Sequence, residues 1–150
     1  MELIGSVFDG RGRAGDFAWM IEQPDYDDAL FVFNDNEAQF RAHQAHVAGA
    51  GACGASAGNA VIRPYQCQDP PRAAGIPTGD HGGFPRLTDG ARQAIDDALA
   101  AIQTVLASGR YRRVIYSAAD ESGALGTGIF VVGDDVKRYI VDGLRRVTSS

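Results

Sequence analysis

The feature that most constrains this chain is a short, unbroken run of apolar residues, Ala29-Leu30-Phe31-Val32-Phe33. A strand with one face in water alternates apolar and polar residues, whereas an unbroken apolar run is typical of a strand covered on both faces. Asn34-Asp35-Asn36 follows directly and is expected to end the strand. The run therefore predicts a central strand in a sheet that carries helices on both faces.

Two segments have the apolar spacing of amphipathic helices. The longer one lies between Thr88 and Ser108, with Thr88 or Asp89 as its N-cap and Gly109 as its end. Its apolar stripe consists of Ala91, Ala94, Ile95, Ala98, Leu99, Ile102, Val105 and Leu106. A closing helix is predicted from the three-to-four-residue spacing of Val136, Ile140, Leu144 and Val147.

The remaining segments alternate between strand and helix patterns. We expect strands or short extended pieces over 2–8, 61–62, 75–78 and 114–117, and helices over 16–23 and 37–47. This alternation predicts an α/β fold, a three-layer α/β/α sandwich with a central mixed, mostly parallel sheet. With 150 residues, the chain is expected to form a single domain over 1–150.

Charge and hydropathy exclude several classes of protein. The chain has 14 basic and 19 acidic residues and a net charge of −5, which makes general nucleic-acid binding an unlikely function because phosphate contacts need a basic surface. No apolar stretch approaches the ~20 residues that cross a bilayer. We therefore expect a protein without a membrane-spanning segment.

The two cysteines, Cys53 and Cys67, are too few for a disulfide framework, and no segment resembles a secretory signal. A cytoplasmic location is the default expectation. Together with His43 and His46 the cysteines could supply four zinc ligands, but the spacing is irregular and lacks a Cys-x-x-Cys knuckle. Surface histidines and small buried cysteines are the better interpretation, so we predict neither a metal nor a cofactor.

Two glycine-rich segments are typical of loops that hold phosphate groups. Leu125-Gly126-Thr127-Gly128-Ile129-Phe130 follows the strand pattern at 114–117 and precedes the last helix, and 49–58 contains a second run of glycines. Glycine lets backbone N–H groups turn toward an anion, and the next helix contributes its positive end. The alternative is a pair of tight turns without a ligand. Two such loops favour a nucleotide.

These motifs resemble the macro domain family, three-layer α/β/α modules that bind ADP-ribose and in many members hydrolyse its derivatives. Gly15-Asp16 precedes a helix, 28–36 reads as an apolar strand followed by asparagines, and Thr127-Gly128-Ile129-Phe130 is similar to the second glycine loop of the family. The resemblance covers most of the chain and implies a divergent, macro-like branch.

The resemblance implies a role for each matching residue. Asp16 would contact adenine, Gly58 and Asn59 would line the first glycine loop, and the amides of Gly126, Thr127, Gly128 and Ile129 would surround a diphosphate. Phe130 would stack on a ribose or base, unless it packs in the core. Asn34 and Asn36 would orient the distal ribose and an attacking water. The base could be Asp35, Asp69 or a phosphate of the substrate.

The chain departs from the family pattern in two places. One residue separates Asn34 from Asn36 where the family usually has two, so turn formation is an equal explanation for Asn36. The first glycine loop also lacks a lysine or aspartate that could serve in catalysis. Binding is therefore a safer prediction than hydrolysis.

We expect the chain to bind ADP-ribose or a related NAD-derived nucleotide, with an ADP-ribosylated molecule as the partner and cleavage at the distal ribose as a secondary prediction. One alternative is a non-catalytic nucleotide sensor or sponge. Another is a protein-interaction module that has no nucleotide ligand and uses the tract 63–80 as its contact surface. Within that tract, Arg63 could meet a phosphate or a carboxylate.

Overall fold

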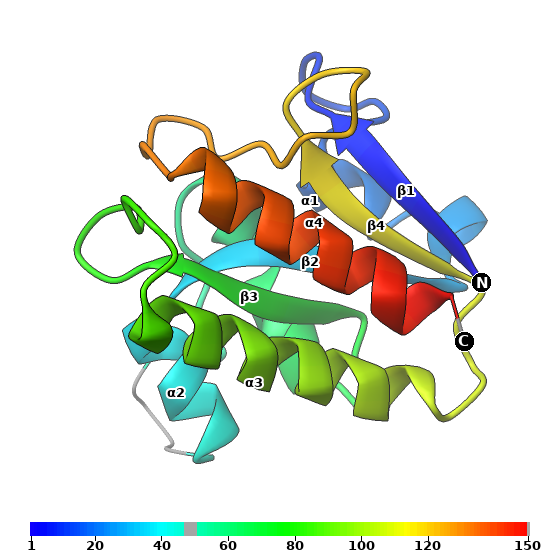
Figure 1. Ribbon diagram of the computed structural model, residues 1–150. Helices are drawn as coiled ribbons and strands as arrows, with labels where there is room; N and C mark the ends of the chain where they lie inside the picture. Colours follow the sequence, from blue (N-terminus) through cyan, green and yellow to red (C-terminus); the bar gives the residue numbers. More distant parts are fainter. Residues whose placement is uncertain (47–50, 150) are drawn as a thin grey trace.

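The computed structural model describes residues 1–46 and 51–149, and these form an α/β fold around a four-stranded sheet (Figure 1). The strands are β1 (Glu2–Val7), β2 (Ala29–Asn36), β3 (Ala73–Gly79) and β4 (Arg113–Ala118). They lie in the order β1-β4-β2-β3, and every pair is parallel. The expectation of a mixed sheet is thus wrong for the described residues. Because the sheet is all parallel, the carboxyl ends of all four strands meet at one edge.

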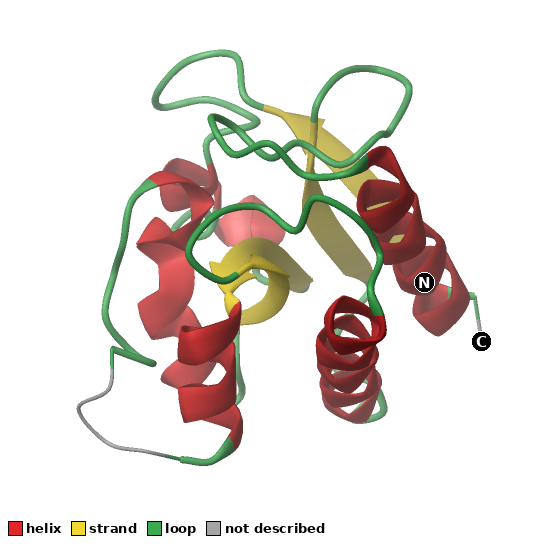
Figure 2. Cartoon of the chain, turned by 60° about the vertical axis from the view of Figure 1, so that its left-hand side comes forward, coloured by secondary structure: helices red, strands yellow, loops and turns green. Residues whose placement is uncertain are grey.

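Helices lie on both sides of this sheet, as the apolar run in β2 predicted (Figures 1 and 2). The α-helices are α1 (Phe17–Met20), α2 (Glu37–Gln44), α3 (Asp89–Leu106) and α4 (Asp134–Thr148), and two 3-10 helices are η1 (Pro24–Tyr26) and η2 (Gly58–Cys67). Figure 1 shows α3 and α4 side by side in front of the sheet, with η2 behind it. No helix of the described residues is long and apolar enough to cross a membrane.

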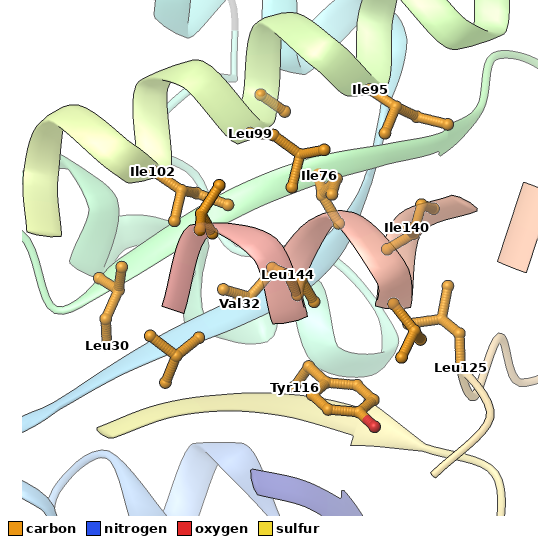
Figure 3. Close-up of a cluster of buried hydrophobic side chains, with 14 of the residues drawn as sticks. Leu30, Val32, Ile76, Ile95, Leu99, Ile102, Tyr116, Leu125, Ile140 and Leu144 are labelled. Atoms are coloured by element: carbon orange, nitrogen blue, oxygen red, sulfur yellow. The ribbon is translucent and has the colours of Figure 1, made fainter. Parts of the chain in front are cut away.

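One face of the sheet packs against α3 and α4 mainly through aliphatic side chains, with the Tyr116 ring among them (Figure 3). Leu30 and Val32 of β2 point to this face, because alternate residues of a strand share a side. They meet the stripe predicted for α3 and the buried residues of α4, among them Ile95, Leu99, Ile102, Ile140 and Leu144. The two amphipathic helices of the sequence therefore cover the same face.

The opposite face packs against α1 and η2. Phe31 and Phe33, the other alternate residues of β2, are fully buried there with Phe17 and Ile62. The rings of Phe17 and Phe31 meet edge to face with centroids 5.3 Å apart, the arrangement that aromatic pairs prefer. β2 is thus covered on both faces by different kinds of element.

Four expected boundaries differ from the structure. β2 does not end at Phe33 but continues to Asn36, because Asn34, Asp35 and Asn36 pair with β3. Val61 and Ile62 lie in η2 and not in a strand. The helix expected over 16–23 is the four-residue α1, and α2 ends at Gln44. Residue 47, its expected end, lies outside the described residues, as do positions 49 and 50 of the first glycine run.

The two cysteines also differ from expectation. Cys53 and Cys67 form a disulfide with their Cα atoms 5.9 Å apart, and both residues are exposed, not buried. Since they are bonded to each other, they are not free thiolates for the zinc site considered above. In the described residues no three His, Cys, Asp or Glu side chains are placed to hold a metal ion.

Candidate functional site

The candidate site lies where β2 and β4 separate at the carboxyl edge of the sheet. Their ladder ends at the pair Val32–Tyr116, although both strands continue beyond it. The Asn34 side chain spans the opening by donating a hydrogen bond from Nδ2 to the carbonyl oxygen of Gly126, at 2.7 Å. This bond joins residues 92 positions apart. The asparagine-containing strand end and the second glycine loop therefore converge, which the sequence did not show.

The glycine loop after β4 is held at its base. Gly126 donates its backbone N–H to Ser117 at 2.9 Å, and a Cβ at Gly126 would lie 3.0 Å from the Ala118 backbone, which disfavours a larger residue. The Tyr116 hydroxyl donates to the Gly123 carbonyl oxygen at 2.6 Å. Burial raises the pKa of that hydroxyl, so it stays a donor at neutral pH. The loop thus leaves the sheet from a fixed position.

The tip of the loop presents backbone donors to the outside. Gly128 has φ +61°, a left-handed conformation that favours glycine, and nothing lies within 4 Å of the position of a Cβ there. Within the described residues, the N–H groups of Thr127, Gly128 and Ile129 donate no hydrogen bond to the protein. Thr127 uses its hydroxyl to bind the Phe130 carbonyl oxygen at 3.0 Å. Three adjacent amides are therefore available to a ligand or to water.

Apolar side chains accompany these amides. Ile129 is 93% exposed, Phe130 57% and Val131 85%. The alternative prediction that Phe130 packs in the core is therefore wrong. Monomeric proteins do expose single apolar residues, but three in succession on one loop tip form a small apolar surface.

Asp35 lies at the same edge but is enclosed. Its Oδ1 is 2.6 Å from Nη2 of Arg63, and their side chains are 0% and 6% exposed respectively. Arg63 also donates to the Gly54 carbonyl oxygen at 3.0 Å. The sequence left a phosphate and a carboxylate open as partners of Arg63, and the structure pairs it with the carboxylate of Asp35. Because the Asp35 side chain is fully buried against Arg63, its carboxylate has no contact with solvent. This geometry does not favour Asp35 as the base that activates a water on a bound ribose.

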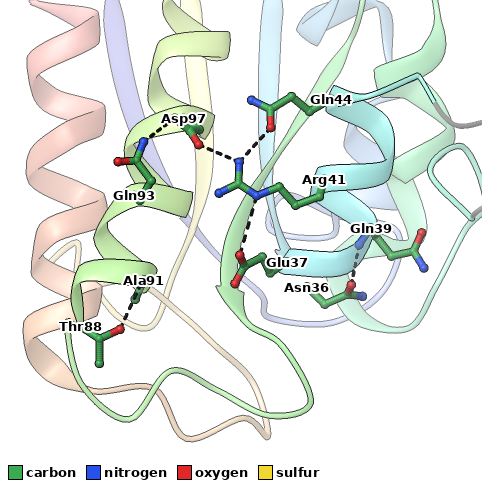
Figure 4. A network of polar contacts seen from close by, with 9 residues as sticks. All are labelled: Asn36, Glu37, Gln39, Arg41, Gln44, Thr88, Ala91, Gln93 and Asp97. Carbon is green, nitrogen blue, oxygen red and sulfur yellow. Dashed lines mark hydrogen bonds and ion pairs between the residues drawn. The ribbon is translucent and has the colours of Figure 1, made fainter.

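Asn36 is engaged as a helix cap. Its Oδ1 accepts a hydrogen bond from the Gln39 backbone N–H at 2.8 Å, which satisfies one of the free donors at the start of α2 (Figure 4). The side chain of Asn36 is thus used locally by the backbone, which was the alternative to a ligand contact for this residue.

The network drawn in Figure 4 then fixes α2 against α3. Arg41 of α2 donates to Asp97 of α3 at 2.7 Å, and this hydrogen bond is the main reason that the pKa of Asp97 is lowered. Glu37 lies 3.7 Å from the same guanidinium. The helix that Asn36 begins is therefore tied to α3.

The other predicted ligand residues have different hydrogen-bond partners from the second glycine loop. Asp16 is half-buried before α1, where its Oδ2 accepts from the Gly12 N–H at 2.9 Å. Gly58, with φ +64°, begins η2, and Asn59 follows it half-buried. In the described residues no hydrogen bond joins Asp16 or Asn59 to the loop 126–130. The structure thus brings together Asn34 and the second glycine loop, and among the described residues it shows no hydrogen bond from Asp16 or Asn59 to them.

Sequence reasoning missed the loop after β3 as a neighbour of the site. Phe84 accepts a hydrogen bond from Gly133 at 2.9 Å, and a Cβ at Gly83 would lie 2.1 Å from the Val131 carbonyl oxygen. The pair Gly82-Gly83 was the available signal, since glycine often marks a close backbone approach. This contact holds the far end of the glycine loop.

A hollow of about 320 Å³ lies beside the loop, between 122–125 and α4. Lys137, Arg138 and Arg145 line it together with Asp134 and Asp142. Two of its cations are paired, Lys137 with Asp134 and Arg145 with Asp142, both at 3.3 Å. The hollow thus adjoins the candidate site without containing its asparagine or its exposed amides.

Comparison with known protein families, with curated proteins and with solved structures finds no match to this chain.

Proposed function

We propose that this protein binds ADP-ribose or a related NAD-derived nucleotide at the carboxyl edge of its sheet, as a divergent macro-like domain. The observation that carries the proposal is the hydrogen bond from Asn34 to Gly126, which brings the end of β2 and a glycine loop with exposed amides to one place. Ligands of parallel α/β sheets bind outside the carboxyl ends of the strands, which supports this location.

The chemistry of the loop suits a diphosphate. Backbone N–H groups carry partial positive charge and need no basic side chain, so an acidic protein can hold an anion in this way. The exposed ring of Phe130 offers a surface on which a base or ribose could stack. In this proposal Asp16, Gly58 and Asn59 contact the remainder of the nucleotide.

Binding without cleavage is the form of this function that we favour. Asp35 is buried against Arg63 and Asn36 caps α2, so two of the three residues at the end of β2 that were considered for hydrolysis are already engaged. Asn34, the third, contacts the loop backbone. A sensor or sponge for an ADP-ribosylated molecule fits this arrangement and requires no cofactor. A cytoplasmic location remains a prediction, but the disulfide removes the argument from cysteine usage that supported it.

Glycine 128 allows a direct test. Gly128→Glu places bulk and negative charge where the diphosphate is expected, and Gly109→Glu is a matched control because Gly109 also has positive φ and open space around its Cβ position. Both variants carry a similar backbone cost of about 1–2 kcal/mol. Calorimetry with ADP-ribose should show binding to the wild type and to Gly109→Glu, and a loss of at least about tenfold in affinity, roughly 1.4 kcal/mol, in Gly128→Glu.

Thermal unfolding with ADP-ribose and with AMP provides the companion measurement, because a ligand that binds only the folded state raises its stability. We expect stabilisation by ADP-ribose and none by AMP. If ADP-ribose has no effect on the wild-type protein, the proposed ligand is wrong. If it binds Gly128→Glu as tightly as Gly109→Glu, the proposed loop is wrong.

A further inference from the structure

An exposed disulfide with a histidine beside it joins the end of η2 to the loop that precedes η2. Cys67 Sγ is 4.0 Å from Nδ1 of His43 and 3.7 Å from the Ala52 carbonyl oxygen. Cys53, its partner, is exposed and has no such neighbour among the described residues. The two sulfur atoms of one bond therefore have different surroundings.

The charges around His43 come from two elements besides its own helix. Burial is the main cause that lowers the pKa of His43, the charge of His46 just after α2 lowers it further, and the buried Asp35 of β2 opposes both. Arg63 of η2 faces the same region and is paired with Asp35. At neutral pH the imidazole is therefore neutral while the disulfide is intact, so it is free to accept a proton.

We propose that the Cys53–Cys67 bond is a reversible thiol-exchange site, in which Cys67 is the leaving sulfur and His43 stabilises its thiolate. The direction follows from the geometry, because a sulfur leaves faster when its thiolate is stabilised, and a neighbouring imidazolium lowers the pKa of a thiol. The co-reactant is a small dithiol or a dithiol protein. This exchange does not depend on nucleotide binding.

The reaction balances as a two-electron exchange. A thiolate of the dithiol attacks Cys53 Sγ, the bond between Cys53 and Cys67 breaks, and its electron pair stays on Cys67. The neutral His43 takes up the proton that the attacking thiol released, and the negative charge of the Cys67 thiolate holds that proton on the imidazole. The second thiolate of the reductant attacks the mixed disulfide and releases Cys53. The dithiol is oxidised to a disulfide, and the protein gains two electrons and two protons.

The exchange would act on the segment that supports Arg63. The disulfide closes residues 53–67, and within this segment Arg63 binds both Asp35 and Gly54. Gln66 also donates to the Ala52 carbonyl oxygen at 2.6 Å. After reduction, the hydrogen bonds from Arg63 to Gly54 and from Gln66 to Ala52 would still connect the two ends of the segment. Reduction of the disulfide would therefore loosen the segment that contains η2 and leave the pairing of the strands unchanged.

The test measures how fast each cysteine of the reduced, folded protein reacts with iodoacetamide as a function of pH, with the sites separated by mass spectrometry. At pH 7 we expect Cys67 to react roughly tenfold faster than Cys53, because a neighbouring imidazolium enriches its thiolate. His43→Gln should remove this difference. His81→Gln is the matched control, since His81 is fully exposed in a different loop, and it should preserve the difference.

Cys53 serves as an internal reference, so the wild-type pH profile decides the question even if His43→Gln fails to fold. Equal rates for the two cysteines, or a Cys67 rate that is unchanged in folded His43→Gln, would overturn the role of His43. A disulfide that resists excess dithiothreitol until the protein unfolds would overturn the exchange site itself.

Discussion

The two faces of the sheet are stabilised in different ways. Toward α3 and α4, the contacts are mainly aliphatic and include Leu30, Ile102 and Leu144, each fully buried. Toward η2, aromatic packing is combined with the Asp35–Arg63 ion pair and the disulfide. Hydrophobic contact is non-directional and tolerates small movements, whereas a buried ion pair requires defined geometry. The first face therefore provides a stable base, and the second fixes the position of one segment.

This difference also concerns the candidate site. Arg63 fixes Gly54 and the end of β2 through a single guanidinium. The glycine loop after β4 is instead anchored by Ser117, Tyr116 and the contact with 83–84. Changes on the η2 side should thus disturb the first glycine segment and leave the second in place. The following variants test this separation.

The largest effect is expected for Arg63→Met, which leaves the buried Asp35 carboxylate without its cation. Removing one partner of a buried ion pair costs about 3–5 kcal/mol, because the remaining charge is not compensated. Urea unfolding of the variant measures this loss in the free energy of unfolding. A loss below about 1 kcal/mol would mean that the pair is open to water in solution.

The control for that variant is the double substitution Asp35→Asn with Arg63→Met. It removes both charges and keeps a side-chain oxygen that can accept from the Asn36 N–H, as Asp35 does at 2.9 Å. Replacing a whole buried pair is often close to neutral. The double variant should therefore be more stable than Arg63→Met alone, and the opposite order would contradict an uncompensated charge as the cause.

On the other face, Leu144→Ala should cost about 2–5 kcal/mol in the free energy of unfolding, because it removes buried methyl groups and leaves a cavity. Leu144 is fully buried between α4 and the sheet. Ile129→Ala is the matched control, since Ile129 is 93% exposed on the glycine loop, and it should change stability by less than about 0.5 kcal/mol. Comparable losses in the two variants would contradict the exposed position of the loop.

The sequence predicted the first face better than the second. The stripe from Ala91 to Leu106 has helical spacing, so it specified both the helix and its buried side. The continuous run in β2 likewise indicated cover on both faces. These features succeed because apolar periodicity is local in the chain and reports burial directly.

The second face depends on contacts that local patterns do not contain. Val61 and Ile62 fit a short strand, but the segment forms η2 with Pro64 inside it, because it packs as a helix over Phe31 and Phe33. The pairing of Cys53 with Cys67 and of Asp35 with Arg63 joins residues 14 and 28 positions apart. A sequence with only two cysteines does not show whether they are bonded to each other. It also does not show which carboxylate an arginine will pair with.

The smallest predicted effect concerns Asn36, which either caps α2 or contacts the ligand. Asn36→Ala should cost about 1 kcal/mol by removing the cap of α2, close to the cost of Thr88→Ala, which removes the cap of α3. Asn36→Ser keeps a capping oxygen and should restore most of that stability. We also expect Asn36→Ser to retain the ADP-ribose affinity of the wild type, because the asparagine oxygen is already used by the helix. A folded Asn36→Ser with about tenfold weaker binding in calorimetry would instead assign Asn36 to the ligand, as the resemblance implied.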